Sequence, residues 1–416
     1  MFKKICDKVY IVYNRIAHGA YALLKVFMRW RTPTTITGEG CIRRVPEILA
    51  ACGSKHPLVV TDPWLAEHLA PRLEEALQDA GVAYTLYSDV LPNPTIANCE
   101  HARDVYVAEG CDGLVALGGG APMDTAKTCG ALVARPGKTA RQMCGKFGVG
   151  RKLPPLIAIP TTAGTGSETT LAAVIVDQED HHKTSIMDPV LMPRYAVLDP
   201  LLTVGLPPFV TATTGLDTLV HALEAYFSRS NSTRETNQLA EDAVRIVFRF
   251  LERAYNDGTD MEARAQMQIA ANKGGFAFSR VGVGNVHAIA HTLGGLYNTP
   301  HGLANAVILP YVLKDYGPRI QKKLAYLAEC VGLTFGGTEE ERANAFIAEV
   351  EAMNRRMGIP AGFDFIRDED IEQMITWAMK EANPVYPVPQ VYTREHFRKV
   401  IEQIRVPAQE ERSETA

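Results

Sequence analysis

Residues 113–127 read GLVALGGGAPMDTAK, and this stretch decides the fold. The apolar run from Gly113 to Leu117 is typical of a buried strand, and it leads into three consecutive glycines. Pro122 suits the first turn of a helix, where its missing N–H costs nothing, so we expect a helix to follow. A strand, a glycine-rich turn and a helix in this order favour a nucleotide-binding fold. The segment is not the G-x-G-x-x-G fingerprint, so a structural turn and a phosphate site both remain open for it.

The sequence around this stretch alternates between strand-like and helix-like segments from Thr34 to about Leu206. Short apolar runs predict strands, and amphipathic runs predict helices. The expected strands are 57–61, 84–87, 113–117 and 156–159, and the expected helices are 65–80 and 98–109. Such alternation indicates a parallel sheet with helical crossovers.

Beyond Pro207-Pro208 the strand-like runs nearly vanish, and long amphipathic segments take over. The clearest of them are 233–255, 261–278, 339–357 and 368–381. A chain of 416 residues has room for two domains. We therefore predict a basic N-terminal extension at 1–32, a Rossmann-like α/β domain at 33–206 and an all-α domain at 207–416.

Bulk composition excludes several classes of protein. Apolar residues make up 46% and charged residues 22%, and the formal net charge is -4, which gives no general affinity for nucleic acid. The eight cysteines contain no C-x-x-C pair, which favours reduced thiols and a cytoplasmic location. No run of 18 or more apolar residues occurs, so we expect no membrane-spanning helix.

The first 31 residues carry seven basic side chains and one acid, so the remainder of the chain sums to -10. Apolar residues recur there at helical spacing: Val9, Val12, Ile16, Ala20, Leu23 and Phe27. Two interpretations remain open. The segment is a helix that packs on the protein's own surface or on a second subunit, or it is a basic amphipathic helix in peripheral contact with an anionic membrane.

Two further segments belong to the predicted nucleotide site. Residues 160–168, PTTAGTGSE, follow a buried strand and are dense in small hydroxyl residues that suit phosphate and ribose oxygens. Asp62 ends the strand at 57–61, where an acid in dinucleotide folds accepts hydrogen bonds from the ribose of NAD and disfavours NADP. The alternative for Asp62 is a cap on the following helix, with Pro63 at its first position.

A cluster of metal-ligating residue types lies in the second half of the chain. Asp217 and His221 are four residues apart, and so are His287 and His291, so each pair shares one helix face. His301 follows a turn-like segment. Imidazole and carboxylate without thiolate suit a catalytic Fe²⁺ or Zn²⁺ site better than a structural zinc site.

These motifs together identify a family. The chain resembles the iron-containing (group III) alcohol dehydrogenases, the family of lactaldehyde reductase and 1,3-propanediol dehydrogenase, over roughly residues 33–405. The resemblance rests on the segments 92–95 (PNPT), 118–124 (GGGAPMD), 160–168, 215–224 (GLDTLVHALE) and 286–302 (VHAIAHTLGGLYNTPHG).

The resemblance implies an enzyme that uses NAD and one divalent metal, Fe²⁺ or Zn²⁺, to interconvert an alcohol with its aldehyde or ketone. It implies that Asp217, His221, His287 and His301 bind the metal, and that His291 lies close to nicotinamide and substrate as the proton relay. The residues expected to bind the cofactor are Asp62, Asn93, Gly118, Gly119, Gly120, Ala121, Asp124, Thr161, Thr162 and Thr165. Ala121 departs from the family pattern, which usually has serine there.

Two alternatives to this function remain at the level of sequence. One is an enzyme of similar architecture, like dehydroquinate synthase or glycerol dehydrogenase. The other is a metal-binding interaction protein without turnover, in which the basic N-terminal segment is the working part. We expect a small alcohol or aldehyde as the partner molecule, no nucleic acid, and a homodimer or larger homo-oligomer.

Overall fold

The computed structural model describes residues 2–26, 30–179, 182–230, 232–333 and 336–407. The chain forms two compact units, neither of which is one contiguous stretch. The α/β unit comprises residues 29–211 and 253–279, and the helical unit comprises residues 1–28, 212–252 and 280–416. The domain boundary that the sequence predicts between residues 206 and 207 stays a prediction.

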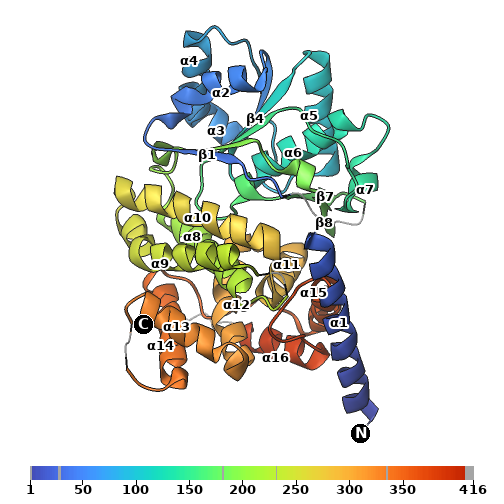
Figure 1. Ribbon diagram of the computed structural model, residues 1–416, viewed down its shortest axis with the longest axis vertical. Coiled ribbons are helices and arrows are strands. Elements are labelled where there is room, and N and C mark those ends of the chain that lie inside the picture. The colour runs from blue at the N-terminus through green and yellow to red at the C-terminus, as the bar shows by residue number, and fades with distance from the viewer. Residues whose placement is uncertain (1, 27–29, 180–181, 231, 334–335, 408–416) are drawn as a thin grey trace, which may run out of the picture. The chain divides into compact units, whose positions relative to one another are not determined.

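A parallel six-stranded sheet forms the centre of the α/β unit (Figure 1). In spatial order its strands are β1 (Thr34–Thr37), β9 (Tyr195–Leu198), β6 (Leu156–Pro160), β4 (Gly113–Gly118), β2 (Pro57–Val60) and β3 (Thr85–Tyr87). The predicted parallel sheet is confirmed, and all four expected strands are present. Strand order reverses between β2 and β4, because β3 lies beyond β2 on the opposite side from β4.

Alternate residues of the central strands enter two separate cores, as the two-residue period of a strand requires. Val115 and Leu117 of β4 pack with α2 (Val45–Cys52) and α4 (Ala70–Asp79) on one face of the sheet. Leu114 and Ala116 of β4 pack on the other face with α5 (Ile96–Ala108) and α6 (Gly120–Ala134). Both faces are thereby covered, which explains why the strands read as continuous apolar runs.

Several local features of the α/β unit differ from the sequence predictions. The helix expected at 65–80 is divided into α3 (Pro63–His68) and α4, because Pro71 begins a new first turn there. A second, three-stranded sheet was not predicted, and it contains β5 (Gly145–Lys146), β8 (His182–Met187) and β7 (Ala172–Asp177). Its strands β7 and β8 pair antiparallel. The remaining helices of the unit are α7 (Ala140–Met143) and most of α10 (Met261–Val281).

Helices build the second unit, as predicted. They are α1 (Phe2–Val26), α8 (Pro208–Phe227), α9 (Arg234–Asn256), α11 (Asn285–Tyr297), α12 (His301–Tyr316), α13 (Gln321–Cys330), α14 (Glu339–Arg356), α15 (Ile371–Ala382) and α16 (Arg394–Ile404). The predicted helix at 368–381 begins as a 3-10 turn and becomes an α-helix at Ile371. None of the helices described is long and apolar enough to cross a membrane.

The N-terminal helix expected from apolar spacing is confirmed as α1, but the apolar positions are not the face that packs on the protein. Val9, Val12, Ile16 and Leu23 are exposed, whereas Asn14 and His18 of the opposite face are buried. Phe27, the last apolar position of the predicted helix, lies outside the described residues.

Candidate metal centre and nucleotide-binding edge

Three helices of the helical unit bring four metal-ligating side chains together. Asp217 and His221 lie one turn apart on α8, His287 lies in the first turn of α11, and His301 is the first residue of α12. One potential ligand atom from each residue lies within 4.8 Å of the others. Asp217, His221 and His287 are buried, while the His301 side chain keeps 34% of its surface exposed and leaves the cluster accessible from that side. Three imidazole nitrogens and one carboxylate oxygen suit Fe²⁺ or Zn²⁺.

Glu224, two turns from Asp217 on α8, fixes how His287 presents its ring. Its Oε1 accepts a hydrogen bond from the Val286 amide, and its Oε2 accepts one from the Gly284 amide. His287 Nδ1 lies 2.6 Å from the same Oε2. Because two backbone N–H groups already donate to this carboxylate, Glu224 acts as the acceptor and Nδ1 carries the proton. Nε2 therefore carries no proton and presents its lone pair as an acceptor, which a metal ligand requires.

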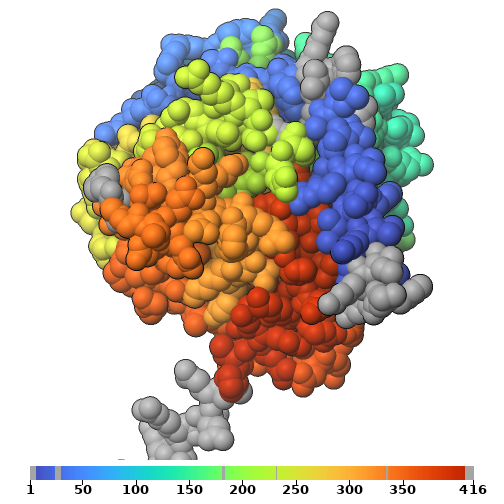
Figure 2. All heavy atoms as spheres, turned by 60° about the horizontal axis from the view of Figure 1, so that its bottom comes forward, coloured from blue at the N-terminus to red at the C-terminus, as the bar shows by residue number. Residues whose placement is uncertain are grey.

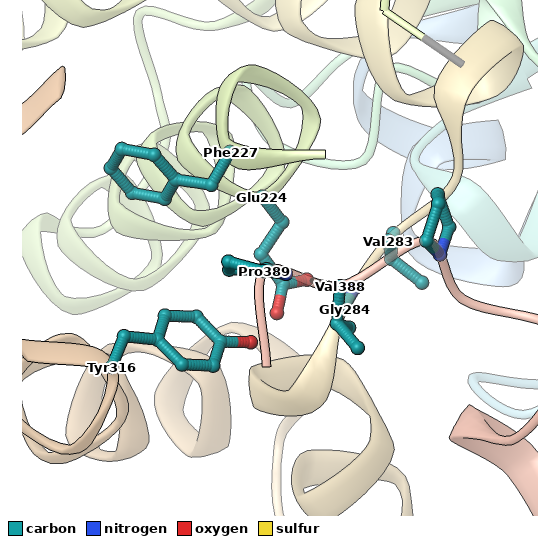
Figure 3. Close-up of a pocket in the computed structure, with 8 residues that line it drawn as sticks. Glu224, Phe227, Val283, Gly284, Tyr316, Val388 and Pro389 are labelled. Carbon is teal, nitrogen blue, oxygen red and sulfur yellow. Dashed lines mark hydrogen bonds between the residues drawn. The ribbon is translucent and has the colours of Figure 1, made fainter. Parts of the chain in front are cut away.

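Burial shifts both members of this pair away from the charged state. It lowers the pKa of His287 well below its usual value, with added repulsion from His221, His301 and His291. It raises the pKa of Glu224 to about 8, so Glu224 accepts all three N–H groups as a carboxylate once it has lost its proton, a state that those donors favour. Figure 3 shows the Glu224 carboxylate and the Tyr316 hydroxyl in a small pocket whose lining includes Gly284, Val388 and Pro389. A neutral His287 ring fits a metal ligand.

Asn305, one turn beyond His301 on α12, holds the carboxylate of the cluster. Its Nδ2 donates to Asp217 Oδ1 at 2.6 Å. The same nitrogen lies 3.3 Å from His287 Nε2 and 3.1 Å from His301 Nε2, so it contacts three of the four candidate ligands. Sequence reasoning missed Asn305, although its spacing of four residues from His301 was a usable signal.

His291 lies beside the cluster without belonging to it. Its ring centroid is 5.2 Å from that of His301 and 5.9 Å from that of His287. Its Nδ1 is 2.6 Å from Glu381 Oε1 on α15, and the Tyr386 hydroxyl donates to that same oxygen at 2.6 Å. His291 Nδ1 and the Tyr386 hydroxyl thus share one Glu381 oxygen. This contact orients the imidazole and leaves its Nε2 for a ligand. Glu381 and Tyr386 were not among the sequence candidates.

The predicted cofactor residues gather at one edge of the sheet in the α/β unit. Asp62 follows β2, the three glycines begin at the last residue of β4, and Thr161 follows β6, and these strands are direct neighbours. The Thr161 amide donates to Gly118 O at 3.2 Å, which joins two of the three loops. Asn93 lies in the loop after β3, the next strand outward. This edge includes the point where strand order reverses, the usual ligand position in open α/β sheets.

The glycine-rich turn leaves a narrow space that a side chain would fill. Gly118 has φ +150°, and a Cβ on it would approach a Pro122 side-chain atom to 2.4 Å. A Cβ on Gly119 would lie 3.4 Å from Thr162, and a Cβ on Gly120 would lie 3.3 Å from Thr165. Gly119 precedes the 15-residue helix α6 and offers no capping side chain. The first amides of α6 are therefore available to an anion.

Two predicted cofactor residues have structural partners of their own. Asp62 caps α3, since its Oδ1 accepts from the Leu65 amide at 2.9 Å; the predicted cap is therefore present, and it can coexist with a contact to ribose. Asp124 accepts from Ser167 Oγ and from the Val174 amide. Ala121 is the first residue after Gly120 in α6. Their roles in cofactor binding stay predictions.

A buried lysine next to this edge was missed. Lys127 of α6 is fully buried, and its Nζ donates to Ser167 O, Ser167 Oγ, Thr170 Oγ1 and Ala172 O over 2.7–2.9 Å. Burial lowers the pKa of Lys127 to about 8. The amine thus ties the loop after β6 to α6.

Comparison with known proteins agrees with this geometry. Residues 32–200 match the family described as iron-containing alcohol dehydrogenase, and residues 211–405 match the C-terminal part of the Fe-containing alcohol dehydrogenase family. The chain therefore belongs to the iron-containing alcohol dehydrogenases. Helix α1 lies before the first matched residue.

Individual relatives cover most of both chains. Alcohol dehydrogenase 4 of Schizosaccharomyces pombe is 36% identical over 84% of this chain and 83% of the relative. Lactaldehyde reductase of Escherichia coli is 34% identical over 83% of this chain and 91% of its own length. The crystal structure of a 1,3-propanediol oxidoreductase has a TM-score of 0.87 and 33% identity, and covers 91% of this chain and 100% of that one. The predicted family and fold class are confirmed.

Proposed function

We propose that this chain interconverts an alcohol with its aldehyde or ketone by hydride transfer to and from NAD. The observation that carries the proposal is the convergence of Asp217, His221, His287 and His301 within 4.8 Å. Membership in the iron-containing alcohol dehydrogenases makes the chain an oxidoreductase of this type. A relative from Bacillus methanolicus, 35% identical, is named as an NAD-dependent methanol dehydrogenase, which supports the choice of cofactor.

The four residues would hold Fe²⁺, or Zn²⁺ in its place. Such a cation supplies Lewis acidity toward the substrate oxygen, which favours loss of the hydroxyl proton. Glu224 holds the His287 proton on Nδ1, so Nε2 points a lone pair into the cluster. Asn305 restrains the Asp217 carboxylate. The chain thus supplies an oriented ligand set rather than a set that must assemble on binding.

His291 is the candidate for moving the proton. Its ring stacks on His301, and Glu381 fixes its orientation. With Nδ1 directed at a carboxylate, Nε2 exchanges a proton with a group outside the pair. The Tyr386 hydroxyl bonds to the same Glu381 oxygen and stabilises its negative charge.

The turn at Gly118–Gly120 and the loop at Thr161–Thr165 would bind the pyrophosphate and adjoining sugar of NAD. Glycine at positions 119 and 120 keeps side-chain bulk out of the turn, which would let a phosphate approach the backbone closely. The uncapped first turn of α6 supplies N–H donors. Asp62 follows the neighbouring strand β2 and supports a preference for NAD over NADP.

Two variants test the assignment of roles. His287→Ala is expected to lose most bound metal and turnover, because one of four ligands is gone. His291→Ala is expected to keep the metal and lose about 10²–10⁴-fold in kcat. Metal content by mass spectrometry and NADH absorbance with primary alcohols provide the two readouts. Full metal occupancy in the first variant, or metal loss in the second, would contradict the roles proposed.

The proposal also covers the location of the enzyme and its assembly. We place the enzyme in the cytoplasm, supported by the eight cysteines, all described and none in a disulfide. We also propose a homodimer or larger homo-oligomer acting on a small alcohol or aldehyde. Sedimentation of the purified full-length chain over a tenfold range of concentration tests the assembly.

A further inference from the structure

Helix α1 presents an apolar face to solvent. Of the thirteen large hydrophobic side chains that are exposed among the described residues, five lie on this helix, and each is 57–69% exposed. They are Val9, Val12, Tyr13, Ile16 and Leu23. Their spacing of three, four and seven residues places them on one side of the helix. We call these five residues the α1 apolar face; α1 is the blue helix on the surface in Figure 2.

Arg15, Asn14 and His18 lie on the side of α1 that faces the helical unit. Arg15 donates to the carbonyl oxygens of Val388 and Pro389, each at 2.7 Å. Asn14 and His18, one turn apart on the same side, are buried. The usual arrangement of a surface helix is thereby reversed. Because the two Arg15 bonds fix its rotation, the apolar face stays directed outward.

The charge of this segment indicates what covers the apolar face. Residues 1–31 carry seven basic side chains against Asp7 alone, while the remainder of the chain sums to -10. Lys8, one residue before Val9, is exposed. A second copy of α1 would bring like charge to the same face and be repelled. An anionic bilayer surface attracts basic side chains and accepts apolar ones at the headgroup–acyl boundary.

We propose that α1 attaches the protein to the surface of anionic membranes, with the α1 apolar face inserted at the interface and exposed basic side chains such as Lys8 against lipid headgroups. The helix lies on the membrane and does not cross it. The catalytic assignments do not enter this argument, so it holds or fails independently of them.

The test uses the full-length chain with vesicles of phosphatidylcholine alone and vesicles that also contain phosphatidylserine. We compare the unmodified protein with the double variant Val12→Ser, Ile16→Ser. Val107→Ser is the matched control, because Val107 is a 62% exposed valine on α5, far from α1 in sequence. Thermal melting of each variant verifies that it is folded.

The unmodified chain and Val107→Ser are expected to sediment with phosphatidylserine vesicles and to be released by high salt. The double variant is expected to lose about tenfold or more in partition coefficient, since two inserted side chains are gone. No binding at low salt, equal binding to neutral vesicles, or full binding by the double variant would overturn the proposal. Light scattering that shows self-association lost in the double variant would assign the face to a second copy and overturn it as well.

Discussion

Glu224→Gln is the substitution that tests how the metal centre is supported without touching a ligand. The carboxylate accepts three N–H groups: Val286 on Oε1, and Gly284 and His287 Nδ1 on Oε2. A glutamine keeps the shape and one acceptor oxygen. Its amide nitrogen takes the place of Oε2. This nitrogen is itself a hydrogen-bond donor, so it cannot accept from the two N–H groups that Oε2 served. His287 must then turn away or move its proton to Nε2, the atom that faces Asp217.

The size of the effect follows from what remains in place. Asp217, His221 and His301 are unchanged, and one bond from Val286 survives, so the site weakens without being lost. Loss of a carboxylate behind a metal-bound histidine typically costs about 10–100-fold in metal affinity. That range equals about 1.4–2.7 kcal/mol of binding free energy.

The measurement is a competition titration of Fe²⁺ or Zn²⁺ against a chelator of known affinity, followed by NADH formation at saturating metal. Glu235→Gln is the matched control, since Glu235 is an exposed acid of the same unit paired with Arg280. We expect weaker metal binding only in the Glu224 variant, with activity largely restored by excess metal. Unchanged affinity in a folded Glu224→Gln protein would refute the reasoning about the His287 tautomer.

Three other substitutions probe separate parts of the molecule. Glu381→Gln should keep metal and substrate KM but lower kcat about tenfold or more, because His291 loses its carboxylate; steady-state kinetics with metal analysis decide this. Asp62→Gly should raise kcat/KM with NADP relative to NAD and, through loss of the α3 cap, cost about 1 kcal/mol of stability in urea titrations. Lys127→Met tests the buried amine, whose pKa is lowered to about 8. Its stabilising contribution is complete above its unfolded pKa near 10.4 and is lost as the pH falls through 8. Relative to the variant, the unmodified chain should therefore gain about 1.4 kcal/mol per pH unit between those values.

Local features of the fold could be predicted because their causes are local. The strand at 113–117 and the turn at Gly118–Gly120 follow from an apolar run ended by glycine. The pair Asp217 and His221 follows from helical spacing. The second sheet was missed because β7 and β8 are defined by pairing with each other, and neither has turn residues that mark a hairpin.

The supporting contacts of the site could not be predicted in the same way. Glu224 and His287 are 63 residues apart, and His291 and Glu381 are 90 apart. No periodicity links such positions, and an acid on a helix is usually solvated. Only burial distinguishes Glu224 from the exposed acids, and burial follows from the packing of α8 against α11, which a single sequence does not reveal.

The contacts on the buried side of α1 limit which variants can test the exposed α1 apolar face. Arg15 holds the carbonyls of Val388 and Pro389, and these two residues also line the pocket that contains the Glu224 carboxylate. Deleting α1 would release this segment and expose the pocket behind His287, so lost activity or metal after truncation says nothing about a membrane. Substitutions at Val12 and Ile16 leave the Arg15 bonds intact and change only what faces outward. A variant that keeps its metal and its turnover while losing vesicle binding therefore separates attachment to a surface from support of the metal centre.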